Sequence, residues 1–100
     1  MVYITQLIYI KPGKEDVFDE FETVAIPTIA KYNGRLQLRL RPGKDAYVEG
    51  HIEKPYEIHL VSFESEEDFE RFKKDEERKK FLHLKEQSVT ETIMILGSRV

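Results

Sequence analysis

The sequence of 100 residues is 40% hydrophobic and 35% charged, which is typical of a soluble globular protein, so we predict one domain over residues 1–100. A formal net charge of −3 gives no general attraction for nucleic acid or an anionic membrane. No apolar run approaches the roughly 18 residues that span a bilayer, and the absence of cysteine excludes disulfides and thiolate chemistry. The first predicted strand begins at Val2 and leaves no room for a signal peptide, so we expect a cytoplasmic protein.

The first two predicted elements are a strand over residues 2–10 and a helix over residues 15–32. The strand carries apolar side chains on both alternating faces, which is typical of a central strand covered on two sides. In the helix, apolar residues recur with a period of about 3.6, and the early acidic residues, Glu22 among them, fall mostly on the opposite face. Pro27 lacks an amide donor and predicts a break near residues 24–27, and Asn33-Gly34 supplies the helix stop.

The next two strands are predicted over residues 35–41 and 56–63. The first alternates strictly, which indicates a half-buried edge strand with Leu36, Leu38 and Leu40 inward and Arg35, Gln37, Arg39 and Arg41 on the opposite face. A short extra strand is expected over residues 46–49. Residues 56–63 form the strand around which the chain is organised, because both of its faces carry large apolar groups. One of these faces also carries Glu57 and His59, the ionisable groups that the pattern places in the interior.

Two short helices and a last strand complete the chain. Ser65 is the expected N-cap of the first helix, with Asp68 three residues later in a variant of the capping box, and Asp75 is the expected N-cap of the second. The last strand is predicted over residues 89–96. The order β-α-β-β-α-β predicts an α+β, ferredoxin-like fold with a four-stranded antiparallel sheet, in which the first and third strands lie at the centre.

This arrangement leaves one face of the sheet without helices. The uncovered face would present apolar side chains from the first, third and last strands to water, and soluble monomers rarely expose an apolar patch beyond roughly 300–600 Å². We therefore expect a symmetric homodimer in which the two sheets face each other. The alternative is a monomer in which residues 42–55 fold over the open face.

Several segments of the chain resemble the small proteins of domain-of-unknown-function family 1330. The resemblance spans nearly the whole chain, and the segments that carry it are Tyr32-Asn33-Gly34-Arg35, Val48-Glu49-Gly50, residues 56–63 with Ser65, and Phe72-x-x-Asp75-x-Glu77-Arg78. That family belongs to the dimeric α/β-barrel superfamily, which also holds antibiotic-biosynthesis monooxygenases. The resemblance implies a ferredoxin-like protomer in a dimeric barrel, with a cavity inside or beside each sheet, and implies no particular reaction.

His59 is the best candidate for chemistry, with Glu57 two residues away on the same face. A histidine beside a carboxylate can act as a general base, so we predict these two as catalytic residues. Arg39 and Gln37 are expected to approach from the neighbouring strand, where an arginine would hold an anion or a developing enolate, and Tyr9 is a further ligand-binding candidate. The structural alternative is a packing histidine with a cross-strand ion pair between Glu57 and Arg39.

The remaining histidines, His51 in a loop and His83 at a helix end, have no metal-binding spacing, so we predict no metal site and no cofactor. Two functional hypotheses remain. The first is a dimer that binds a small organic ligand, either as a cofactor-free isomerase or as a monooxygenase, and it requires a cavity with polar side chains pointing in. The second is a non-catalytic structural or interaction module that uses the sheet face only for dimerisation, and it predicts a filled interior.

Overall fold

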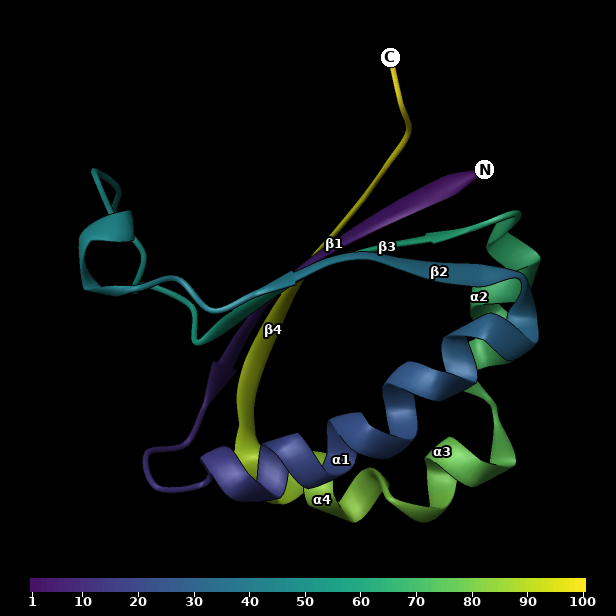
Figure 1. Cartoon of the computed structure of the whole chain (residues 1–100), viewed down its shortest axis with the longest axis horizontal. Helices are drawn as coiled ribbons and strands as arrows, with labels where there is room; N and C mark the ends of the chain where they lie inside the picture. The colour runs from purple at the N-terminus through teal and green to yellow at the C-terminus, as the bar shows by residue number, and fades with distance from the viewer.

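The computed structural model describes residues 1–100 and contains a curved four-stranded sheet with all the α-helices on one side (Figure 1). The strands are β1 (Val2–Ile10), β2 (Gly34–Leu40), β3 (Glu57–Phe63) and β4 (Val89–Gly97). The α-helices are α1 (Glu15–Thr28), α2 (Glu66–Lys73), α3 (Glu76–Lys80) and α4 (Leu82–Ser88), and two short 3-10 helices are η1 (Ile29–Tyr32) and η2 (Lys44–Ala46). None of the helices is both long and apolar enough to cross a bilayer.

The sheet order is β2-β3-β1-β4, and every neighbouring pair is antiparallel. This is the predicted ferredoxin-like topology, with β1 and β3 at the centre. The helices cover one side of both central strands, and most of the buried apolar side chains of the sheet therefore belong to β1 and β3. Ile4 and Phe63, which have 0% and 1% of their surface exposed, anchor that side. We call it the helix-facing side and the other the open side.

Both predicted helix caps are present. The Ser65 hydroxyl accepts a hydrogen bond from the Asp68 amide at 3.1 Å, and the Asp75 carboxylate accepts one from the Arg78 amide at 2.8 Å. Each cap satisfies an amide that has no partner within its helix. The cap at Asp75 starts α3 immediately after the turn that ends α2, and this turns Arg78 back toward the sheet.

The junction between α1 and β2 differs slightly from the expectation. α1 continues through Pro27 to Thr28 and then tightens into η1, so the break lies just after the proline and not before it. Pro27 lies in the last turn, where the missing amide removes only one helical hydrogen bond. Asn33 ends η1 in the left-handed conformation with φ 57°, which confirms the predicted stop.

The prediction of which β2 side chains share a face is wrong beyond Leu36, because the pairing of β2 with β3 is irregular. Leu36 lies opposite Val61, but Leu38 lies opposite Leu60 and Arg39 opposite His59, so one extra residue is inserted near Gln37. A bulge of this kind reverses the faces of all residues beyond it. Leu38 and Leu40 therefore lie on the open side, and Arg39 lies on the helix-facing side. The expected strand over residues 46–49 is also absent, because η2 and a loop occupy this region.

The open side of the sheet is not covered by the chain itself. Residues 42–55 extend past the ends of β2 and β3 and do not fold back over the sheet (Figure 1). Apolar side chains of the open side consequently remain accessible, with exposed fractions of 43% for Leu38 and 54% for Ile95.

Candidate ligand-binding cavity

A cavity of about 160 Å³ lies between the helix-facing side of the sheet and the helices. Thirteen of its 20 lining residues are hydrophobic. The lining residues come from β1, β3 and β4, from η1 and from the four α-helices. Met94 of the edge strand β4 lines the cavity and is also 44% exposed, so the cavity reaches the molecular surface at this edge. The apolar lining with few polar groups is typical of small-molecule sites.

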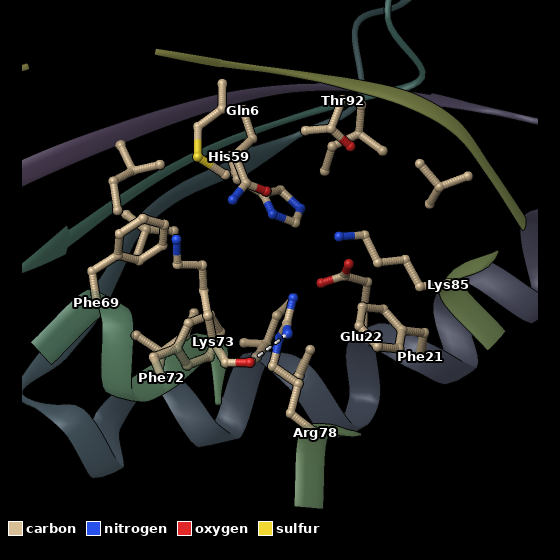
Figure 2. Close-up of a pocket in the computed structure, with 18 of the residues that line it drawn as sticks. Gln6, Phe21, Glu22, His59, Phe69, Phe72, Lys73, Arg78, Lys85 and Thr92 are labelled. Atoms are coloured by element: carbon tan, nitrogen blue, oxygen red, sulfur yellow. Dashed lines mark hydrogen bonds between the residues drawn. The ribbon is translucent and has the colours of Figure 1, made fainter. Parts of the chain in front are cut away.

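Polar side chains enter the cavity from opposite walls (Figure 2). Gln6, His59 and Thr92 project from the sheet, and Glu22, Lys73, Arg78 and Lys85 project from the helices. Each helical group comes from a different helix, since α1, α2, α3 and α4 supply one each. The fold therefore collects a carboxyl group, three cationic groups and an imidazole around one cavity.

Glu22 lies on the buried stripe of α1, four residues after Phe18 and three before Ala25. Only 7% of its surface is exposed, and its carboxyl group forms neither a hydrogen bond nor an ion pair within the chain. Burial, together with the negative charge of Glu57, raises the pKa of Glu22 to about 7 against the opposing effect of Arg39, Lys85 and Arg78. Glu22 is thus close to half-protonated at neutral pH.

Arg78 is held in place by contacts on several sides. Its Nη1 donates to the Lys73 carbonyl oxygen at 3.2 Å, and its guanidinium carbon lies 5.2 Å from the centre of the Phe72 ring and 5.9 Å from that of Phe21. Its Nε is buried and has no hydrogen-bond partner. Burial lowers the pKa of Arg78, but an arginine stays charged in proteins, so a fixed cation with a free donor faces the cavity.

Lys85 is the second cationic group of the cavity. Its side chain is half-buried and makes no ion pair or hydrogen bond within the chain. Burial lowers the pKa of its ammonium group, and repulsion by Arg78 lowers it further, whereas Glu22 raises it. Figure 2 shows the Lys85 ammonium and the Glu22 carboxyl group pointing toward the same part of the cavity.

The cluster around Glu57 adjoins the cavity through His59, the member of the cluster that lines it. The Glu57 carboxylate, with 0% of its residue exposed, accepts hydrogen bonds from Arg39 Nε at 2.9 Å and Arg41 Nε at 2.7 Å, and it contacts His59 Nε2. Burial alone would raise the pKa of Glu57, but these three donors outweigh it and hold the pKa below its usual value. Burial lowers the pKa of His59, which is therefore neutral at pH 7.

The protonation of His59 follows from its partner. An ionised carboxylate accepts only, so the neutral ring donates from Nε2 to Glu57, and Nδ1 is left as an acceptor that has no partner within the chain. His59 can therefore accept a hydrogen bond from a molecule in the cavity. Glu57 itself does not line the cavity, and its two oxygens already contact Arg39, Arg41 and His59.

The predicted site residues divide into two groups. His59, Glu57 and Arg39 come together on the helix-facing side, and His59 lines the cavity. Gln37 lies apart from them, because the bulge in β2 turns it to the open side, where it donates to the Ser62 hydroxyl at 2.9 Å. Tyr9 lies outside the cavity and donates from its hydroxyl to the Glu53 carbonyl oxygen at 2.6 Å. The structure therefore does not bring Gln37 and Tyr9 together with His59, and their role in ligand binding stays a prediction.

Four ionisable cavity residues were missed by the sequence interpretation: Glu22, Lys73, Arg78 and Lys85. Glu22 could have been found, because its spacing from Phe18 and Ala25 places it on the apolar stripe of the helix. Arg78 and Lys85 carry no such signal, since they lie in a highly charged region whose helices are too short to show a period. No group of three or more His, Cys, Asp or Glu side chains in the chain is placed to hold a metal ion.

No protein-family model and no curated protein sequence matches the chain, so the resemblance to family 1330 is not confirmed. Solved structures match across its full length. A protein of unknown function from Rhodopseudomonas palustris has a TM-score of 0.83 at 9% identity, covering 99% of this chain and 82% of its own. An uncharacterised NIPSNAP domain protein from Burkholderia xenovorans scores 0.73 at 11% identity, covering 100% and 95%. A Nitrosomonas europaea protein, provisionally described as an antibiotic biosynthesis monooxygenase, scores 0.77 at 11% identity, covering 100% and 99%. These likenesses establish the ferredoxin-like fold.

Proposed function

We propose that this protein binds a small organic molecule in the cavity between the sheet and the helices, and that Glu22 exchanges a proton with this molecule. The observation that carries the proposal is the convergence of the unpaired ionisable side chains Glu22, Arg78 and Lys85 on one largely apolar cavity. A cavity of about 160 Å³ is similar in size to an engineered cavity of about 150 Å³ that binds benzene. The ligand is therefore about the size of a single substituted ring.

The chemistry best supported by this arrangement is proton transfer next to a carbonyl group, as in a cofactor-free isomerase. A carboxyl group with a pKa of about 7 can both remove and return a proton at neutral pH. The negative charge that develops on the carbonyl oxygen would lie near Arg78 and Lys85, and cations in a water-poor site stabilise such charge. A monooxygenase activity rests only on the descriptions of two fold neighbours, each 11% identical to this chain, and has no further support.

The alternative of a purely structural module is less well supported. Such a module has no reason to retain a buried carboxyl group without a partner, because burying an unpaired ionisable group is unfavourable. Replacing Glu22 with an apolar residue of similar size would fill the same position on α1. The cavity and its ionisable lining therefore favour ligand binding.

We also propose that the protein is a homodimer of the dimeric α/β-barrel type, to which family 1330 belongs. The second copy would cover the open side, where directly paired positions carry Leu38 with Leu60 and Leu7 with Ile93. These side chains are apolar and self-complementary across a twofold axis, so a second copy of the same surface suits them better than a charged partner. Each protomer would keep its own cavity, because that cavity lies on the other side of the sheet.

The proposed proton transfer can be tested by deuterium exchange. Small ketones and 2-oxo acids up to the size of benzoate would be incubated with the protein in D₂O, and the loss of the proton next to the carbonyl group would be followed by NMR. We expect at least one compound to exchange faster with the wild type than with Glu22→Gln. The control is Glu20→Gln, which changes an exposed glutamate on the same helix. Unaccelerated exchange for every compound, together with no rise in melting temperature, would contradict the proposal.

A further inference from the structure

The charges around the cavity do not balance. Arg78 and Lys85 both face it without a carboxylate partner, and the nearest acidic group, Glu22, is not within ion-pair distance of either. Lys73, which also lines the cavity, is paired with Glu70 at 2.9 Å. Glu57 is already compensated by Arg39 and Arg41. The two cations Arg78 and Lys85 therefore face the cavity without matching negative charge, because Glu22 is only partly ionised at neutral pH.

An unpaired buried cation is unfavourable, because it loses hydration without gaining a partner. Arg78 shows this most clearly, since its Nε is a buried donor without an acceptor. The aromatic rings of Phe72 and Phe21 and the bond to the Lys73 carbonyl oxygen fix the orientation of its guanidinium group. A donor that is fixed and unpaired in the absence of ligand is prepared for an acceptor that arrives with the ligand.

We propose that the molecule bound in this cavity is an organic monoanion, and that Arg78 and Lys85 bind its carboxylate. This inference rests on the proposed function, because it names the class of ligand for the same cavity. Two cations that converge from α3 and α4 match the two oxygens of one carboxylate. The rest of the molecule would contact the apolar wall formed by Ile4, Ile8 and Phe18.

The test compares benzoate with benzamide, which has nearly the same shape and no charge, by isothermal titration calorimetry on the full chain. We expect benzoate to bind the wild type at least tenfold more tightly than benzamide, since charge-assisted hydrogen bonds are about twice as strong as neutral ones. Arg78→Gln and Lys85→Gln should each remove roughly tenfold of this preference. Lys79→Gln, which changes an exposed lysine on α3, is the matched control and should keep it.

Equal binding of benzamide and benzoate would overturn the anion inference and leave the proposed function in place. Absence of binding by both would overturn both. Unchanged preference in Lys85→Gln would also overturn the inference, and this variant decides the matter if Arg78→Gln does not fold.

Discussion

Protonation of Glu22 links the stability of the fold to pH. Its pKa rises from 4.5 to about 7 on folding, so between these values the native state holds a proton that the unfolded state releases. The free energy of unfolding therefore decreases as the pH rises through this window and levels off above it. His59 has the opposite effect on the free energy of unfolding. Its pKa in the folded state is below 6.5, so the unfolded state binds the proton more readily and this contribution to stability increases as the pH rises.

The first prediction isolates the contribution of Glu22 from that of His59. Urea unfolding of Glu22→Gln and the wild type would be compared at pH 4.5 and pH 7.5, at one protein concentration. Relative to the wild type, the variant should gain about 3 kcal/mol over this range, because a shift of one pKa unit corresponds to about 1.4 kcal/mol. Identical pH profiles for both proteins would contradict the raised pKa. Glu20→Gln should reproduce the wild-type profile.

Glu57 is predicted to serve stability and the orientation of His59, and not proton transfer. Glu57→Gln removes the charge that pairs with Arg39 and Arg41, and it should lower the free energy of unfolding at pH 7 by about 2 kcal/mol, since the two arginines are partly solvated. The stabilisation by a carboxylate with a lowered pKa is lost at acid pH, so the penalty should shrink as the pH falls below 4.5. A penalty independent of pH would contradict this role, and the exposed Glu64→Gln is the control.

At the residue scale, the sequence predicted part of the site. Alternation along β3 correctly placed Glu57 and His59 on one buried face, because a strand of period two needs no further information. Arg78 and Lys85 could not be predicted in the same way. Their positions depend on how the short helices α3 and α4 pack beneath the sheet, which is a tertiary property that their own highly charged segments do not encode.

At the scale of elements, the start of β2 depends on close packing. A Cβ atom at Gly34 would lie 2.6 Å from Phe63 Cε1 and 2.7 Å from Ile29 Cγ2, and Phe63 is 1% exposed and cannot move aside. Gly34→Ala should therefore destabilise the protein by roughly 1–3 kcal/mol, measured as a lower melting temperature. Gly43→Ala, where nothing lies within 4 Å, should leave the melting temperature nearly unchanged. Equal behaviour of the two variants would contradict the packing.

The bulge in β2 explains why the elements were predicted better than their faces. The leucines at 36, 38 and 40 give a regular period, and nothing in the sequence signals the extra residue near Gln37. The bulge brings Arg39 to the helix-facing side, where it pairs with Glu57. The existence and order of the strands follow from local patterns, whereas register depends on which pairing gives buried charges their partners.

At the scale of the whole molecule, the open side should mediate dimerisation. Leu38 is 43% exposed and lies on the edge strand β2, opposite Leu60 of the central strand β3. We expect the wild type to sediment as a dimer at micromolar concentration and Leu38→Glu to sediment as a monomer, because a carboxylate would be buried in the interface. Ala30→Glu, an exposed position of η1 in the helical layer, should remain dimeric. A monomeric wild type would contradict the dimer.

The most direct test of the proposed function is to locate a bound ligand. Methyl NMR spectra of the protein would be recorded while benzoate and benzamide are added. The ligand should shift the methyl signals of the cavity residues Ile4, Ile8 and Met94, and it should leave those of Leu38 and Leu60 on the open side unchanged. Shifts confined to the open side, or no shifts with either compound, would contradict a binding site between the sheet and the helices.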